Sequence, residues 1–162
     1  KQVWSGNHVI DWGKRVTIPA SEFKNFTTQA TIVIYYDQDA SSDYEDIQPC
    51  NSKWERLPFT VEGMKFSGDF NPRSFYGTSG KSHITPMIFT GTELNSLKSG
   101  GVIIQGHGIT FTKIVLMDTP NAIHLPTVNP DSDNTLYDLR GVKISNPQNG
   151  KVYIVRGKKI LR

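Results

Sequence analysis

Short runs of β-branched and aromatic residues, separated by turn-forming residues, dominate this sequence. Apolar residues at helical spacing are scarce, so little of the chain can form an amphipathic helix. The separating residues are Gly, Pro, Asn, Asp and Ser, which favour turns. The densest run is Thr31-Ile32-Val33-Ile34-Tyr35-Tyr36, whose composition is typical of a strand. About eight such runs predict an all-β fold, a two-sheet antiparallel β-sandwich with a jelly-roll-like arrangement.

The predicted strands lie within the first 118 residues. They are Gln2–Ser5, Lys14–Ile18, Ala30–Asp37, Tyr44–Pro49, Phe59–Val61, Ser82–Phe89, Gly101–Gly106 and Thr110–Met117. One brief helix is expected after Thr90, because Thr90 and Glu93 resemble a capping box. Gly100-Gly101 would end that helix.

The composition changes after Met117. Residues 118–134 contain three Pro, three Asn and three Asp, which is typical of a linker. Three strand-like pieces follow, with Asn149-Gly150 as a hairpin-turn signal between the last two; the pieces are Leu136–Leu139, Val142–Ile144 and Val152–Val155. The sequence therefore predicts a β-sandwich over 1–118, a linker over 119–134 and a short C-terminal β-hairpin appendage over 135–162.

Charge also separates the tail from the rest. The chain has 18 basic and 15 acidic residues, but seven of the basic ones and none of the acidic ones follow Asp138. The first 138 residues are therefore acidic, whereas a nucleic-acid-binding domain needs a basic stripe. No apolar run approaches the roughly 20 residues of a membrane helix, so we expect no membrane insertion. The chain begins with Lys and no signal-peptide pattern follows, so we expect a processed part of a longer protein.

The tail resembles the C-terminal segment of many secreted Bacteroidetes proteins. The matching residues are Tyr137-Asp138-Leu139-Arg140-Gly141 and Val152-Tyr153-Ile154-Val155-Arg156-Gly157-Lys158-Lys159-Ile160-Leu161. The resemblance implies a role similar to the sorting signals of the type IX secretion system, and a secreted or cell-surface location. The tail is shorter than such segments usually are. The alternative is a plain β-hairpin with solvated Lys and Arg side chains.

The body resembles non-catalytic carbohydrate-binding modules of polysaccharide-degrading enzymes from gut and rumen Bacteroidetes. Short motifs carry this resemblance: Val3-Trp4-Ser5-Gly6, Asp11-Trp12-Gly13, Ile18-Pro19-Ala20-Ser21-Glu22-Phe23, Ile32-Val33-Ile34-Tyr35-Tyr36, Leu97-Lys98-Ser99-Gly100-Gly101-Val102-Ile103-Ile104-Gln105-Gly106 and Thr110-Phe111-Thr112-Lys113-Ile114. It implies a β-sandwich that binds a plant-type polysaccharide and does no chemistry.

Two tryptophans are the stacking candidates for such a site. Flat aromatic side chains cover the apolar faces of sugar rings at a low entropic cost. Trp12 lies between Asp11 and Gly13, where little else needs burial, and Trp54 has polar neighbours on both sides. The alternative for both is a place in the core. The resemblance implies that Trp4 packs structurally.

Polar candidates lie on two predicted strands. Tyr44, Asp46 and Gln48 alternate with Ile47, so they share the outer face if Ile47 points into the core. Amides suit sugar hydroxyls because they donate and accept at once. Gln105 lies within an apolar run and needs partners or a ligand. His107 could extend that polar face, and Tyr76 could lie at its fringe. An ordinary solvated strand face is the alternative.

The sequence gives less support for a catalytic site or a metal site. A glycosidase needs two facing carboxylates; Asp46 and Glu55 fit by composition, but their spacing does not support the pair. No Gly-x-Ser-x-Gly elbow and no zinc-ligand spacing occur. The single Cys50 cannot form an internal disulfide. We expect no cofactor. The alternative is a structural Ca²⁺ bound by the acid-rich stretch from Asp37 to Asp46.

These observations predict a binding function. The expected ligand is a plant cell-wall polysaccharide, either β-glucan or cellulose or xylan, and we expect a monomer without a nucleic-acid partner. The module would target a covalently linked glycoside hydrolase to its substrate. The alternative is a structural or adhesin-like β-sandwich that spaces the domains of a secreted protein.

Overall fold

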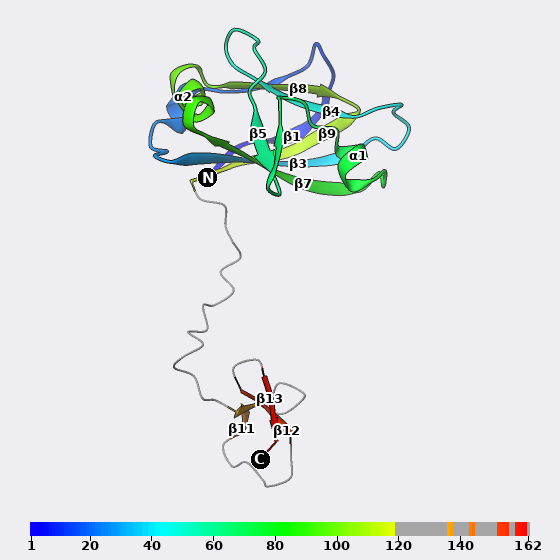
Figure 1. Cartoon of the computed structure of the whole chain (residues 1–162). Helices are drawn as coiled ribbons and strands as arrows, with labels where there is room; N and C mark the ends of the chain where they lie inside the picture. Colours follow the sequence, from blue (N-terminus) through cyan, green and yellow to red (C-terminus); the bar gives the residue numbers. More distant parts are fainter. Residues whose placement is uncertain (119–135, 138–142, 145–151, 156–157, 162) are drawn as a thin grey trace. The chain divides into compact units, whose positions relative to one another are not determined.

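The computed structural model describes residues 1–118 with their side chains. Beyond them it describes only the backbone of residues 136–137, 143–144, 152–155 and 158–161 (Figure 1). The chain divides into two compact units, Lys1–Asn121 and Ala122–Arg162. The predicted linker lies outside the described residues, so the predicted domain boundaries stay a prediction.

Two antiparallel sheets form the first unit, as predicted. The larger one has the order β1 (Gln2–Ile10), β9 (Ile109–Met117), β3 (Gln29–Gln38), β7 (Ser82–Thr90), β5 (Phe59–Val61) and β6 (Met64–Phe66). The smaller one has the order β2 (Val16–Ile18), β8 (Val102–His107) and β4 (Asp46–Cys50). Each predicted strand of the body has its counterpart here: β5 has the predicted bounds, and the other strands have shifted ends. The sequence missed β6, and it predicted β1 five residues too short.

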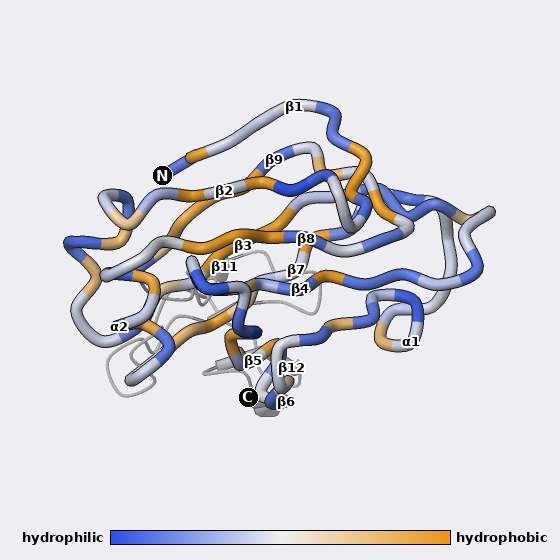
Figure 2. Tube along the Cα trace, turned by 90° about the horizontal axis from the view of Figure 1, so that it is seen from above, coloured by the Kyte–Doolittle hydropathy of each residue, from blue (hydrophilic) through white to orange (hydrophobic). Residues whose placement is uncertain are grey.

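The core lies between the two sheets. Along β3 the alternate residues Ala30, Ile32, Ile34 and Tyr36 are fully buried, as the period-two alternation of a strand requires. Val16 and Ile18 of β2, with Val102 and Ile104 of β8, meet them from the smaller sheet. Figure 2 shows the hydrophobic residues gathered in the strands and the hydrophilic ones in the connections.

Two helical segments contribute buried side chains to the same core. The 3₁₀ helix η1 (Ala20–Phe23) and the helix α2 (Gly91–Gly100) bury Phe23, Leu94 and Leu97. Thr90 is the N-cap of α2, but its side chain makes no capping hydrogen bond. The predicted capping box is therefore wrong, although the helix and its end at Gly101 are confirmed. The sequence did not predict the five-residue helix α1 (Pro72–Tyr76), which Asn71 caps through Ser74 N.

The second unit forms a small sheet in the order β11 (Lys143–Ile144), β10 (Leu136–Tyr137), β12 (Val152–Val155) and β13 (Lys158–Leu161). The predicted hairpin between β11 and β12 is wrong, because β10 lies between those two strands. Besides β10, β12 pairs antiparallel with β13, which begins three positions after β12 ends. The Asn149-Gly150 signal lies outside the described residues.

Gly106 sets the pairing of β4 with β8, so its replacement should destabilise the fold. A Cβ at this position would lie 1.9 Å from the carbonyl oxygen of Asp46. We expect Gly106→Ala to lower the free energy of unfolding by about 1–3 kcal/mol, measured by urea denaturation. Gly13→Ala is the control, since a Cβ there meets nothing within 4 Å. Equal stability of the two variants would contradict this account of the pairing.

Candidate functional site

The outer face of the smaller sheet collects most of the predicted site residues. In β8, Ile104 points into the core, so Gln105 and His107 point to the other side. The register pairs Gln105 with Gln48 and His107 with Asp46. Because paired residues of neighbouring strands share a face, these four side chains form one continuous surface. We call this surface, from Asp46 and His107 to Gln48 and Gln105, the polar strip.

Hydrogen bonds run along the polar strip in one direction. Nε2 of Gln105 donates to Oε1 of Gln48 at 3.3 Å, and Nε2 of Gln48 donates to Oδ2 of Asp46 at 2.6 Å. Gln48 is only 4% exposed, so its amide mainly orients its two neighbours. The prediction that Ile47 points into the core, opposite Asp46 and Gln48, is confirmed.

Asp46 ends this chain in an unusual environment. Its Oδ1 is buried and has no hydrogen-bond partner among residues 1–118. Burial raises the pKa of the Asp46 carboxyl above its ordinary value, and the hydrogen bond from Gln48 opposes this shift only in part. The carboxylate therefore keeps an unused acceptor in a partly desolvated position.

Three rings stand at one end of the polar strip. Tyr44 stacks on His107 with ring centroids 4.3 Å apart, and Nε1 of Trp12 donates to the hydroxyl of Tyr44 at 3.0 Å. The Trp12 ring is nearly parallel to the His107 ring, at 12° and 6.4 Å. Trp12 and Tyr44 stay 42% and 39% exposed, so their outer surfaces remain accessible. We call Trp12, Tyr44 and His107 the aromatic end.

Two carboxylates flank His107. Oδ1 of Asp11 lies 3.5 Å from Nδ1 of His107, and Oδ1 of Asp43 lies 3.9 Å from its Nε2. An open pocket lined by Asp11, Asp43 and His107 adjoins the aromatic end. This end of the surface is therefore rich in hydrogen-bond acceptors.

Trp54 stands beyond the opposite end of β4. It is 46% exposed, and its backbone φ of 66° lies in a region that non-glycine residues seldom adopt. Asn51 builds the turn, since its Oδ1 accepts from the amides of Lys53 and Glu55. Such backbone strain is common at binding sites, where the surrounding structure must hold it.

Arg15 links Trp54 to the outer face. Its guanidinium carbon lies 4.6 Å from the centroid of the Trp54 ring, a cation–π contact. Arg15 directly precedes core-facing Val16 of β2, so the alternation turns Arg15 outward. Exposed aromatic rings thus bound both ends of the polar strip.

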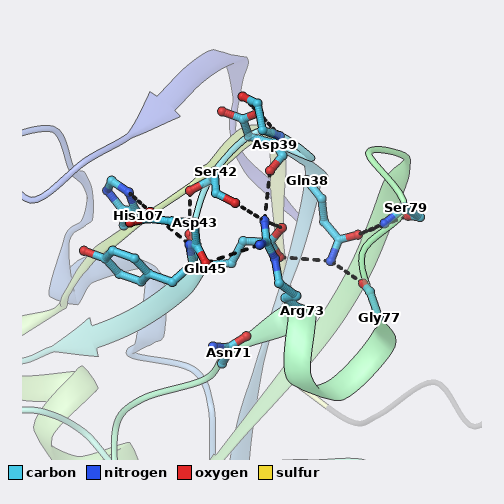
Figure 3. A network of polar contacts seen from close by, with 12 residues as sticks. Gln38, Asp39, Ser42, Asp43, Glu45, Asn71, Arg73, Gly77, Ser79 and His107 are labelled. Atoms are coloured by element: carbon cyan, nitrogen blue, oxygen red, sulfur yellow. Dashed lines mark hydrogen bonds and ion pairs between the residues drawn. The ribbon is translucent and has the colours of Figure 1, made fainter.

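A partly buried ion pair lies next to the aromatic end. Figure 3 shows Arg73 of α1 and Gln38 of β3 converging on Glu45, the residue after Tyr44. The side chain of Glu45 has no exposed surface, and both of its oxygens have partners. Charges are buried this way only when they are paired.

The structure places six of the seven predicted residues around one surface: Trp12, Tyr44, Asp46, Gln48, Trp54 and Gln105. Tyr76 lies elsewhere. Its ring packs on Phe70, Phe75 and His83, and its hydroxyl donates to Glu62. Trp4 packs against the core, as the resemblance implied.

The sequence missed three supporting residues. Arg15 contacts Trp54 from a distant part of the chain, Asn51 acts within its own turn, and Arg73 is 28 positions from Glu45. A turn-forming Asn before Trp54 was the one local signal. No neighbouring residue in the sequence indicated the roles of Arg15 and Arg73.

The described residues hold no group of three or more His, Cys, Asp or Glu side chains that could bind a metal. In the acid-rich stretch, Asp39 accepts from Ser41, while Glu45 pairs with Arg73. None of the helices in the described part of the chain has the length and apolar character needed to cross a membrane.

Comparisons with known proteins give matches among solved structures. No protein family matches the sequence, and no curated protein does. Among solved structures, the chain is similar to SGBP-B of the Bacteroides ovatus mixed-linkage glucan utilization locus, in complex with a mixed-linkage heptasaccharide. The match has a TM-score of 0.52 and 18% identity, and covers 72% of this chain but 29% of that one. At this identity the likeness shows the fold alone.

We predict that replacing Asp46 by its neutral isostere Asn stabilises the fold by an amount that depends on pH. A raised pKa means that the folded state holds the proton more tightly than the unfolded state, so ionisation at higher pH costs stability. We expect Asp46→Asn to raise the melting temperature at pH 7. The gain should shrink as pH falls towards the ordinary Asp value of about 4. Thermal unfolding of both proteins from pH 7 to 3.5 measures this, and a difference independent of pH would contradict it.

Proposed function

We propose that the outer face of the β2-β8-β4 sheet binds a single polysaccharide chain without chemistry. One observation carries the proposal: exposed aromatic rings, Trp12 and Tyr44 at one end and Trp54 at the other, bound a strip of amides and a carboxylate. Sugar rings need both features. Their apolar faces stack on aromatic surfaces, and their hydroxyls both donate and accept hydrogen bonds.

The dimensions favour an extended ligand over a single sugar. β4 has five residues, so its ends lie about 13 Å apart at the rise of a strand. The aromatic rings stand beyond both ends, before and after the strand. A chain lying along β4 would meet Tyr44 first, then the polar strip, then Trp54.

Asp46 supplies an anchoring point on this path. Its Oδ1 is buried and has no hydrogen-bond partner among residues 1–118, so a sugar hydroxyl would satisfy it once the carboxylate turns towards the ligand. A charge-assisted hydrogen bond to a carboxylate is stronger than one between neutral groups. Satisfying this oxygen would offset part of the cost that its burial imposes.

A β-glucan is the ligand that we propose first, and a xylan second. The solved structure similar in fold was determined with a mixed-linkage heptasaccharide, which supports a soluble β-glucan. The few aromatic residues are interspersed with polar groups, which suits a single chain better than a crystalline surface.

The proposal also covers where the module acts and which domain it is attached to. With a tail that resembles a sorting segment, the module would act outside the cell or on its surface. It would hold a covalently attached glycoside hydrolase near its polymer by raising the effective concentration.

Removal of either tryptophan should weaken polysaccharide binding. Truncating an aromatic anchor costs about 2 kcal/mol, so Trp12→Ala and Trp54→Ala should each lower the affinity for mixed-linkage β-glucan or xylan about 30-fold. Affinity gel electrophoresis and titration calorimetry measure this. Tyr76→Phe is the control, because Tyr76 lies away from the surface and keeps its packing.

The outcome separates binding from a spacer role. Unchanged affinity in both tryptophan variants would place the sugar site elsewhere. If a panel of cellulose derivatives, mixed-linkage glucan and xylan leaves the mobility of the native protein unchanged, the binding proposal fails and the spacer alternative gains.

A further inference from the structure

Arg73 binds the connection between β3 and β4 at several points. Its guanidinium donates to three backbone carbonyls, those of Asp39 at 3.3 Å, Ser42 at 2.5 Å and Asp43 at 3.3 Å. The side chain is only 25% exposed and reaches these atoms from α1 (Figure 3). One cation therefore satisfies acceptors across five residues of a connection that lacks regular structure.

The same guanidinium also meets the residue after Tyr44. Nη2 of Arg73 lies 3.5 Å from Oε1 of Glu45, whose side chain is fully buried. Nε2 of Gln38 donates to the other oxygen of Glu45 at 2.9 Å and to the carbonyl of Gly77 at 2.9 Å. The hydroxyl of Ser79 donates to Oε1 of Gln38 at 3.0 Å. Arg73 and Glu45 are thus parts of a fixed network.

Tyr44 lies between the groups that Arg73 holds. Ser42 and Asp43 precede it, and Glu45 follows it. Its backbone is fixed on both sides, while its ring projects to the outer face. There the ring stacks on His107 and accepts a hydrogen bond from Trp12. The position of the Tyr44 ring therefore depends on the contacts of Arg73.

We propose that Arg73 is a positioning residue for the aromatic end, acting through Tyr44 and touching no ligand itself. This inference rests on the proposed function. A surface that is already ordered loses less conformational entropy on binding, so a network that fixes the ring raises affinity. Arg suits this role because its planar fork donates in several directions at once, whereas Lys acts as a point charge.

Arg73→Lys tests the network while it keeps the charge opposite Glu45. Lys cannot reach three carbonyls in the same geometry, so the connection before Tyr44 should loosen. We expect affinity for mixed-linkage β-glucan to fall about tenfold, within the range of coupled neighbours. Hydrogen exchange of the amides from Ser41 to Asp46 should become faster. Arg56→Lys is the matched control, since Arg56 pairs with exposed Asp69.

Double variants separate positioning from general stability. If Arg73 acts through Tyr44, Arg73→Lys should add little further loss to Tyr44→Ala. In the Trp54→Ala variant, Arg73→Lys should lower the affinity by the same further factor as in the wild type, because Trp54 lies at the other end of the surface. Wild-type affinity in Arg73→Lys, or equal multiplication with both partners, would overturn the proposal.

Two further measurements keep the inference testable. If Arg73→Lys does not fold, the paired change Arg73→Met with Glu45→Gln removes both charges and leaves none unpaired. The same comparison with Tyr44→Ala then applies. If the wild-type protein binds no polysaccharide, the proposed function fails, and this inference fails with it as a statement about binding. Unaltered hydrogen exchange at Tyr44 in Arg73→Lys would refute the positioning role by itself.

Discussion

The antiparallel pairing of β4 with β8 is the constraint on which the candidate site depends. It sets Asp46 against His107 and Gln48 against Gln105, so residues about 60 positions apart form one surface. The pairing needs the close approach of Gly106 to the Asp46 carbonyl, where no side chain fits. A register shift of one residue would turn the polar side chains of one of the two strands into the core. The binding face and the fold are therefore fixed by the same contact.

Two neighbouring carboxylates at the start of β4 belong to different polar networks. Glu45, just before the strand, is buried with Arg73 and Gln38, and it holds the chain in place. Asp46, the next residue, lies on the outer side of β4, and its buried Oδ1 has no hydrogen-bond partner in the part of the chain described with side chains. Removing one partner of a buried ion pair costs about 3–5 kcal/mol, so the loss of Arg73 or Glu45 alone would destabilise the fold. In the second network, burial disfavours the ionised form of Asp46 and raises the pKa of its carboxyl.

Local patterns predicted much of this arrangement. The alternation around Ile47 placed Asp46 and Gln48 on the outer face, and a Gln within an apolar run marked Gln105 as needing partners. The polar neighbours of Trp12 and Trp54 indicated exposure, which the structure bears out. Tyr76 gave the same local signal but packs on Phe70 and His83. Its polar, glycine-bearing neighbours do not reveal the aromatic cluster that α1 meets in space.

The sequence by itself determined the all-β class, most strand positions and the direction of each side chain along β4. These follow from period-two alternation and turn chemistry, which are local. Only the tertiary structure decided that β4 pairs with β8, that the Tyr44 ring meets Trp12 and His107, and that Arg73 holds the connection before Tyr44. Those contacts join residues tens of positions apart. Their selection depends on how the two sheets close over a shared core, which no local pattern encodes.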